Sequence, residues 1–173
     1  MKKLEGKNIL IFIGDIYEEL ELWYPKIRLE EEGAKVLLAG PEAKTSYKGK
    51  NGYNGMSDVS YKDINPSDFD ALVIPGGFMP DKLRRDPVVL KITAEFHKQN
   101  KPVAFICHGG WIPISAKIVC GYKVTSVNAI KDDLENAGAT WVDEAVVIDR
   151  NLITSRTPAD LAVFGKAIID ALS

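Results

Sequence analysis

The sequence is poor in the residues and patterns that would assign it to a specialised class of protein. It has only two cysteines and two histidines among 173 residues, and its formal net charge is −2. Two cysteines and two histidines at unsuitable spacing argue against a structural zinc site, so no metal is expected. A single pair of cysteines without a secretion signal predicts free thiols rather than a disulfide. Lysine and arginine form no basic stripe, which disfavours nucleic acid and anionic membranes as partners.

Long apolar runs and glycine-rich nucleotide motifs are also missing. No apolar run approaches the roughly 20 residues that span a bilayer, and the run at 9–13 is followed by Gly14-Asp15 rather than by a signal-peptide cleavage site. No dinucleotide fingerprint or P-loop is present, so no cofactor is expected. The length and the absence of a linker or repeat predict a single domain over residues 1–173, in a soluble, cytoplasmic protein.

What the chain does have is a repeated alternation of short apolar runs with helical patterns. We expect a segment rich in glycine, tyrosine, serine and lysine, 44–65, to be a loop that can contain a small hairpin or an edge strand. Strands are predicted at 8–13, 36–39, 71–74 and 102–106, near residue 124, and at 141–142, 145–148 and 152–154, and helices at 20–29, 88–97, 111–119, 130–136 and from Thr157-Pro158 towards Leu172. This alternation predicts an α/β fold, a flavodoxin-like three-layer sandwich with a mainly parallel central sheet.

Cys107 is placed where the apolar run 102–106 gives way to His108-Gly109-Gly110 and a helical pattern. Such a strand-to-helix turn lifts a side chain away from the sheet, and the first amides of the helix would lower the pKa of a thiol. This setting favours a reactive nucleophile over a buried structural cysteine. Cys120 has no such setting and is interpreted as a packing residue.

Two polar residues could assist Cys107. His108 could act as a general base, but adjacent side chains that leave a sharp turn generally point in different directions, so a structural histidine is the alternative. Glu18 follows the first strand and could hydrogen-bond the sulfur or move a proton, whereas the simpler interpretation is a solvated acidic first helical turn. His97 is predicted to lie on the exposed surface of its helix.

Glycines follow two of the predicted strands. Gly76-Gly77 allows a ligand to approach the backbone closely and could supply an amide that, with the amide of His108, binds an oxyanion. The alternative is a tight turn without a ligand. Because the carboxyl ends of parallel strands share one edge of a sheet, we expect this junction, the Cys107 junction and the loop at 14–19 to lie together.

Several motifs, in the same order, resemble the PfpI family of intracellular cysteine peptidases and deglycases, within the wider ThiJ/PfpI and glutamine-amidotransferase-like group. The resemblance covers nearly the whole chain and includes Glu18 with 21–25, 69–77, 101–104 leading to 106–109, 130–133, 136–138, 141–143 and 155–161.

The resemblance implies a catalytic set and an oligomer. Cys107 is implied as the nucleophile, with Glu18 as its acidic neighbour, and His108 as a partner oriented by Asp81 from a neighbouring subunit, where relatives often have glutamate. The implied oxyanion and substrate-binding residues are Gly76, Gly77 and Gly109. The family forms dimers and sometimes hexamers, so a homo-oligomer is expected.

Two departures from the family pattern concern the pocket. Relatives commonly have proline after Cys-His-Gly, where this chain has Gly110 followed by Trp111, and Val127-Asn128 replaces a common Tyr-Pro. Loss of that tyrosine removes a hydroxyl donor and predicts a different substrate specificity.

The expected activity is therefore a thiol-dependent hydrolysis. Substrates would be small carbonyl compounds such as methylglyoxal or their protein adducts, in glyoxalase or deglycase chemistry, or peptides. The alternatives are a redox-responsive or chaperone-like stress protein in which Cys107 is oxidised without turnover, and a non-catalytic binding domain.

Overall fold

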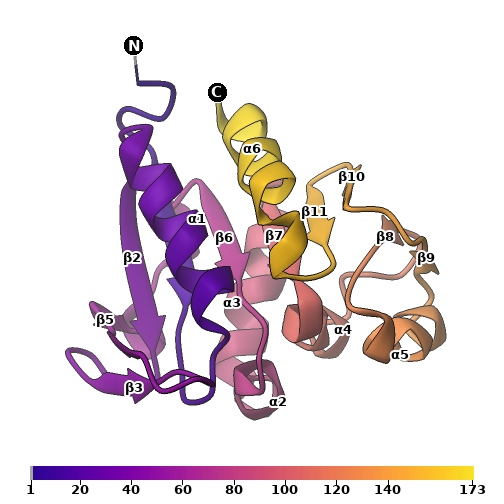
Figure 1. The fold of residues 1–173 in the computed structure, drawn as a ribbon, viewed down its shortest axis with the longest axis horizontal. Coiled ribbons are helices and arrows are strands. Elements are labelled where there is room, and N and C mark those ends of the chain that lie inside the picture. The colour runs from indigo at the N-terminus through magenta and orange to yellow at the C-terminus, as the bar shows by residue number, and fades with distance from the viewer. Residues whose placement is uncertain (1) are drawn as a thin grey trace.

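A computed structural model describes residues 2–173, and its centre is a seven-stranded sheet in the order β10-β11-β7-β6-β1-β2-β5 (Figure 1). Every neighbouring pair in it is parallel except β10 with β11. The strands are β1 (Asn8–Phe12), β2 (Lys35–Gly40), β5 (Val59–Ser60), β6 (Ala71–Ile74), β7 (Val103–Ile106), β10 (Val146–Asp149) and β11 (Leu152–Ser155). The predicted fold is confirmed.

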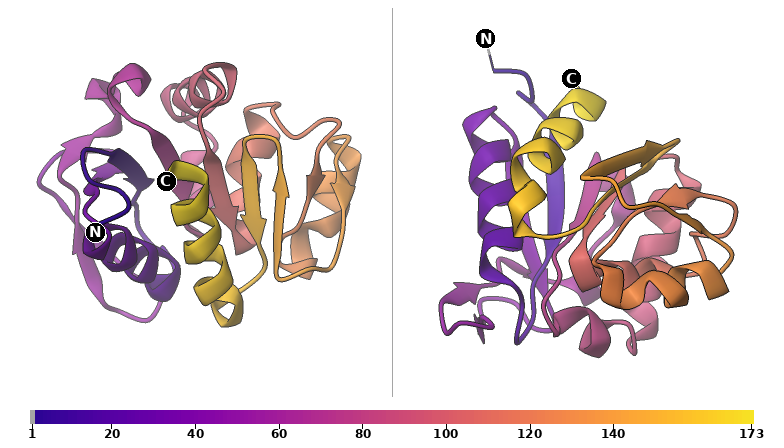
Figure 2. Two further views of the ribbon diagram at one scale, coloured as in Figure 1. Left: turned by 90° about the horizontal axis from the view of Figure 1, so that it is seen from above. Right: turned by 45° about the vertical axis from the view of Figure 1, so that its right-hand side comes forward.

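Helices cover both faces of this sheet. Helices α1 (Glu19–Glu31) and α6 (Leu161–Leu172) lie side by side on one face, and α3 (Pro87–Lys98) lies on the other, as the left view of Figure 2 shows. All residues of β6 and β7 are buried because both faces are covered. The continuous apolar runs in the sequence are the consequence of this two-sided burial.

Smaller elements decorate the sandwich. The segment predicted as a loop with a small hairpin contains β3 (Ser46–Lys48) paired antiparallel with β4 (Asn54–Met56), and β5 is the edge strand after it. The predicted strand near Val124 is β8 (Lys123–Val124), which pairs with β9 (Thr140–Trp141) outside the central sheet. Three short helices complete the fold: α2 (Met79–Leu83), α4 (Trp111–Ser115) and α5 (Lys131–Asn136).

Two details of the region after Cys107 differ from the sequence prediction. The helix expected over 111–119 ends at Ser115, because the chain turns at Lys117, whose φ is +60°. Cys120 therefore lies beyond the helix and is exposed, so its interpretation as a packing residue is wrong. Both cysteines are free thiols, as expected.

The start of the last helix is close to the prediction. Thr157 is the N-cap residue and Pro158 the first residue of a 3-10 turn, Pro158–Asp160, which leads into α6. The Thr157 side chain makes no capping hydrogen bond.

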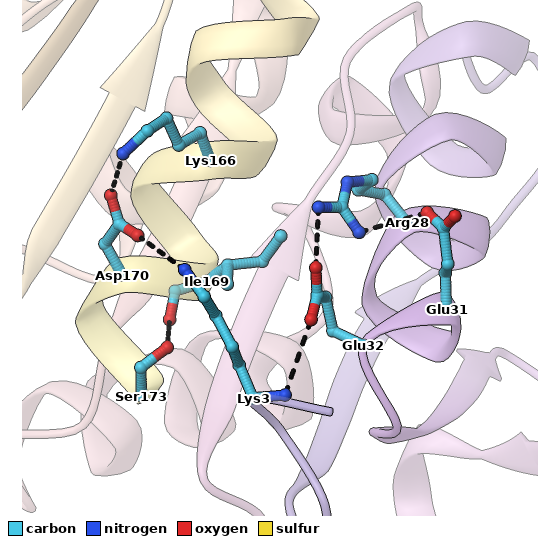
Figure 3. Close-up of polar contacts among 8 residues, drawn as sticks. All are labelled: Lys3, Arg28, Glu31, Glu32, Lys166, Ile169, Asp170 and Ser173. Atoms are coloured by element: carbon cyan, nitrogen blue, oxygen red, sulfur yellow. Dashed lines mark hydrogen bonds and ion pairs between the residues drawn. The ribbon is translucent and has the colours of Figure 1, made fainter. Parts of the chain in front are cut away.

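Charged residues connect the chain before β1 to the two helices on one face (Figure 3). Lys3 Nζ lies 3.8 Å from Asp170 Oδ1 of α6, and its backbone N–H donates to Glu32 Oε2 at 3.4 Å. Arg28 of α1 donates to Glu32 at 2.7 Å and to Glu31 at 3.0 Å. In the described residues, 2–173, no helix is long and apolar enough to cross a membrane.

Candidate active site

Three adjacent strands of the sheet end at one edge, and the residues that follow them form a pocket of about 410 Å³. Glu18 and Glu21 come after β1, Gly77 comes after β6, and Cys107 with His108 comes directly after β7. The sequence prediction that these junctions meet is confirmed.

The backbone of Cys107 is strained in a way that presents its side chain to the pocket. Its φ is +59°, in the left-handed region that side chains other than glycine seldom adopt, and it opens a 3-10 turn, Cys107–Gly110, that continues into α4. Close packing holds this turn against β6. A Cβ atom on Gly109 would lie 2.5 Å from the carbonyl oxygen of Ile74, so only glycine fits there.

His108 contacts the thiol of its own neighbour. Its Nδ1 lies 3.4 Å from Cys107 Sγ, so the expectation that adjacent side chains diverge at this turn is wrong. The ring also packs on Trp111, with 4.9 Å between ring centroids. Burial lowers the pKa of His108, and the positive charge of Lys50 lowers it further. The imidazole is therefore neutral at neutral pH, and Nδ1 can accept a proton.

Glu21 is the carboxyl group that faces Cys107. Its side chain is completely buried, and Oε2 accepts the backbone N–H of Gly76 at 2.7 Å. Oε1 is buried without a hydrogen-bond partner, and the Cys107 thiol acts to lower the pKa of the carboxyl group. Burial, and then the negative charge of Glu18, raise the pKa of Glu21 to about 8. Glu21 is therefore protonated at neutral pH.

Glu18, predicted as the acidic neighbour of Cys107, has another partner. It is the N-cap residue of α1, and its Oε2 accepts the backbone N–H of Glu21 at 2.8 Å. Its own backbone N–H donates to the Gly76 carbonyl at 3.2 Å. Glu18 lines the pocket as predicted, but Glu21 affects the pKa of the Cys107 thiol more strongly than Glu18 does.

A signal for Glu21 was present in the sequence. Glu21, Pro25 and Leu29 are spaced four residues apart and all are buried on α1. An acidic residue on the buried stripe of a helix is unusual, because burial of a charged carboxylate is costly. This position distinguishes Glu21 from the other glutamates of the same helical turn.

The pKa of Cys107 moves against the sequence prediction. Burial raises it to about 12, and the second cause is the negative charge that Glu21 carries once it ionises above about pH 8. The nearby backbone N–H of His108 acts in the opposite direction and lowers the pKa, but its effect is smaller. The resting sulfur is therefore a protonated thiol, and a thiolate must form during the reaction.

The glycines predicted to bind an oxyanion have different positions. The amide of Gly76 is occupied by Glu21, and Gly109 packs under the turn rather than lining the pocket. Gly77 does line the pocket, with a φ of +80°. A Cβ atom there would lie 2.5 Å from the Ile16 carbonyl oxygen and 2.6 Å from the Glu18 nitrogen. Gly77 and the His108 amide remain the possible oxyanion donors.

Asp81 lies on α2 and is not a pocket residue of its own chain. Its carboxylate pairs with Arg85, whose Nε also donates to the Asp81 carbonyl at 3.1 Å. The single chain therefore does not bring Asp81 to His108, and the predicted contact from a neighbouring subunit remains a prediction.

Apolar side chains form the walls of the pocket. Phe78, Trp111 and Val127 line it. Val127 offers no hydroxyl, so the wall there is apolar. No cluster of three or more histidine, cysteine, aspartate or glutamate side chains suited to a metal occurs within residues 2–173.

His97 is not the exposed surface residue that its helical position suggested. It is half-buried, and its Nε2 lies 2.8 Å from the Tyr122 hydroxyl. Burial lowers its pKa. Its role is packing between α3 and the segment before β8, away from the pocket.

Sequence comparisons relate this chain to known proteins. The pattern of the DJ-1/PfpI family matches residues 7–171. Deglycase PfpI of Pyrococcus furiosus is 42% identical over 165 residues, which are 95% of this chain and 99% of that protein. A Bacillus subtilis protein provisionally named as a cysteine protease, YraA, is 39% identical over 167 residues, or 96% of this chain and 99% of that one.

Solved structures show the same fold. A two-domain protein of Anabaena variabilis with DJ-1/ThiJ/PfpI-like and ferritin-like domains has a TM-score of 0.95 and 40% identity, covering 96% of this chain and 48% of that one. Drosophila melanogaster DJ-1beta has a TM-score of 0.89 and 27% identity, covering 96% of this chain and 91% of that one.

Proposed function

Because the chain belongs to the DJ-1/PfpI family, we propose that it is a cysteine-dependent hydrolase whose substrates are small carbonyl compounds or their adducts with proteins. The observation that supports this most directly is the 3.4 Å contact between Cys107 Sγ and His108 Nδ1 inside the pocket. A thiol beside a neutral imidazole is the arrangement that nucleophilic catalysis requires.

Activation of the thiol begins with His108. Because the resting sulfur is protonated and the imidazole is neutral, Nδ1 accepts the thiol proton as Sγ attacks an electrophilic carbon. The transfer creates a thiolate and an imidazolium side by side, so each stabilises the charge of the other. The strained backbone of Cys107 holds the sulfur at this position.

The developing oxyanion is stabilised by neutral donors. The amides of Gly77 and His108 are at the pocket wall, and the protonated carboxyl of Glu21 can donate a hydrogen bond without adding negative charge. An ionised Glu21 would repel both the thiolate and the oxyanion. Protonation of Glu21 is therefore part of the active state.

For methylglyoxal, addition of the sulfur to the aldehyde carbon forms a hemithioacetal. Transfer of a proton from that carbon to the neighbouring carbon, with the hydroxyl proton moving to the neighbouring carbonyl oxygen, converts it into a lactoyl thioester on Cys107. Water then hydrolyses the thioester to lactate and the free thiol, so no external oxidant or reductant is consumed. An adduct with an amine or thiol would release that group during the sequence.

The pocket favours small substrates over peptides. Its volume of about 410 Å³ and its apolar walls suit a short carbonyl compound or the tip of a modified side chain. Relatives that are 42% identical are named deglycases, which also favours small carbonyl substrates over peptides. Attack on a peptide carbonyl would use the same residues and form an acyl thioester, and peptide hydrolysis is therefore the second candidate.

We further propose that a second copy of the chain completes the site by placing Asp81 against the imidazole of His108. Within one chain Asp81 contacts Arg85 and not His108. If the assembly supplies this carboxylate, Asp81→Asn lowers kcat while the oligomer mass stays unchanged in light scattering. An unchanged kcat would contradict a catalytic Asp81.

One substrate panel tests the proposed function. Wild type, Cys107→Ser, His108→Ala, Glu18→Gln and Glu21→Gln are each assayed with methylglyoxal, a methylglyoxal-modified amine and a fluorogenic peptide. Cys107→Ser is expected to abolish multiple turnover, and His108→Ala to lower kcat by about 100-fold because the general base is lost. Glu18→Gln keeps a capping oxygen and is expected to retain most activity.

The panel also separates the alternatives. Full activity of Cys107→Ser on every substrate would contradict the mechanism. Stoichiometric oxidation of Cys107 by peroxide, without turnover of any substrate, would instead favour the redox-responsive protein.

A further inference from the structure

A second hollow, of about 520 Å³, adjoins the Cys107 pocket and has a different chemical character. It shares Ile16 and Lys50 with the Cys107 pocket, so the two are continuous at these residues. Three exposed lysines line it, Lys48, Lys50 and Lys82, and we call these the basic rim. Nothing in the mechanism above uses this hollow.

The basic rim carries a net positive charge. Within residues 2–173 none of its three lysines forms an ion pair, since each lies more than 4.0 Å from every carboxylate oxygen. Asp15 also lines the hollow, and its Oδ1 accepts the backbone N–H of Lys48 at 3.1 Å. Three positive charges and one negative charge leave this surface attractive to anions.

The loop that bears two of these lysines is tied to the active-site backbone. The N–H of Ile16 donates to the Lys48 carbonyl at 2.7 Å, and the N–H of Lys50 donates to the Tyr17 carbonyl at 2.8 Å. The Ile16 carbonyl in turn accepts the N–H of Phe78 at 2.8 Å. The positions of Lys48 and Lys50 relative to the pocket are therefore set by the same loop that precedes α1.

Glu19, which follows this loop, forms no ion pair with the basic rim. Glu19 is buried, and its carboxylate accepts the backbone N–H and the side-chain amide of Asn51. Its pKa is lowered by these hydrogen bonds despite burial. Lys50 also acts inside the pocket, because its charge contributes to the lowered pKa of His108.

We propose that the basic rim is a subsite for an anionic group of the substrate, a carboxylate or a phosphate, on a carbonyl compound or adduct whose reactive carbon lies at Cys107. The inference rests on the proposed function and narrows its substrate class. The small carbonyl end occupies the apolar pocket, and the anionic end reaches past Ile16 to the lysines.

A matched pair of substrates tests this selectivity. The hemithioacetals of methylglyoxal with N-acetylcysteine and with N-acetylcysteine amide differ only in a carboxylate. The double variant Lys48→Gln/Lys82→Gln is expected to lower the ratio of kcat/KM for the acid over the amide by roughly 25-fold, because each of the two charges contributes about fivefold in water. Lys91→Gln on α3, away from the hollow, is the control and is expected to leave the ratio unchanged.

A second measurement does not depend on turnover. In a Cys120→Ser background, which leaves Cys107 as the one thiol, alkylation by iodoacetate is compared with alkylation by iodoacetamide. The ratio of the two rates is expected to fall severalfold in the lysine double variant, and to fall with added sodium chloride in the parent, because the rim attracts the anionic reagent.

Competing anions distinguish carboxylate from phosphate. Acetate and inorganic phosphate are compared as inhibitors of iodoacetate alkylation at constant ionic strength. The anion that slows alkylation at the lower concentration is expected to match the anionic group of the natural substrate. The subsite proposal is wrong if the parent and the double variant have the same acid-to-amide ratio of kcat/KM and the same iodoacetate-to-iodoacetamide ratio of alkylation rates. A lowered alkylation ratio with no turnover of any substrate would support the anion site and contradict the proposed hydrolase.

Discussion

The carboxyl group of Glu21 controls the charge state around Cys107. It is fully buried, it holds the Gly76 amide, and its pKa of about 8 means that it loses its proton just above neutral pH. Below that pH the thiolate forms next to a neutral acid, and above it next to a negative charge. The reactivity of Cys107 should therefore depend on two titrations rather than one.

Glu21→Gln separates these titrations. The amide preserves an oxygen for the Gly76 N–H but cannot ionise, so we expect the variant to be alkylated by iodoacetamide faster than the parent above pH 8. The ratio of variant to parent rates is expected to increase between about pH 7 and pH 9. Rates are measured in the Cys120→Ser background, because Cys120 is an exposed thiol.

A constant ratio across that range would mean that Glu21 does not ionise beside the thiol. Glu31→Gln is the control, since Glu31 lies on the same helix but pairs with Arg28 at the far end of α1. The ratio of its alkylation rate to that of the parent is expected to stay nearly constant with pH.

At this scale the sequence indicated the nucleophile but not its acid. Cys107 stands out because an apolar run, a thiol and two glycines occur in series. Three glutamates occur within one turn of α1, and which of them reaches the thiol depends on where the helix begins. Glu18 became the cap, and Glu21 fell on the buried stripe.

Among the elements, the loops after β1 and β6 are the parts whose geometry tolerates least change. Gly77 sits where the two loops touch, with the Ile16 carbonyl and the Glu18 nitrogen both too close for a side chain. Gly52, in the β3–β4 turn, has a similar positive φ of +96° but open space around its Cα. Comparison of Gly77 with Gly52 therefore separates the effect of backbone strain from the effect of steric contact.

Gly77→Ala is expected to destabilise the protein far more than Gly52→Ala. The positive φ alone costs an alanine about 1 kcal/mol, and Gly77 adds a clash with two backbone atoms that belong to the pocket. Urea unfolding measures both costs, and iodoacetamide labelling of Cys107 reports on the pocket. Equal destabilisation of the two variants would show that the loops can separate to admit a methyl group.

Element by element, the sequence predicted what burial imposes and missed what local backbone turns decide. The strands were identifiable because sheet burial on both faces demands apolar runs, as in β6 and β7. Helix α2 has five residues and no side-chain cap, so it leaves little pattern. The early end of α4 depends on the positive φ of Lys117, and a lysine in the sequence does not predict a positive φ.

On the scale of the whole molecule, the order of strands brings the site together. Strands β7, β6 and β1 are neighbours, although the residues that follow them are separated by crossovers of many residues. Glu21, Gly76 and Cys107 therefore meet only when the sheet is complete. The cost of burying Glu21 is consequently a cost to the folding of the entire domain.

Stability should decrease with pH because of this burial. Folding raises the pKa of Glu21 from 4.5 to about 8, so between these values the folded chain keeps a proton that the unfolded chain releases. The contribution of Glu21 to the free energy of unfolding is complete below pH 4.5 and falls as the pH rises to about 8, by roughly 1 kcal/mol per pH unit.

The comparison is between wild type and Glu21→Gln in urea at pH 5, 6.5 and 8. The free energy of unfolding of the variant, relative to that of wild type, is expected to increase from pH 5 to pH 6.5 and again from pH 6.5 to pH 8. Both proteins keep His97 and His108, so the difference between them isolates the carboxyl group. A difference that does not change with pH would indicate that Glu21 is ionised in the folded protein at all three values.

The contact between Lys3 and Asp170 has a consequence for how the chain can be connected. It brings the segment before β1 beside the last turns of α6 (Figure 1). The Cys107 pocket lies at the other end of the strands, because its residues follow the carboxyl ends of β1, β6 and β7. A short peptide could bridge these neighbouring residues and the chain could be opened at an exposed turn elsewhere. The protein is thus suited to circular permutation, because the new junction would be separated from the Cys107 pocket by the length of the sheet.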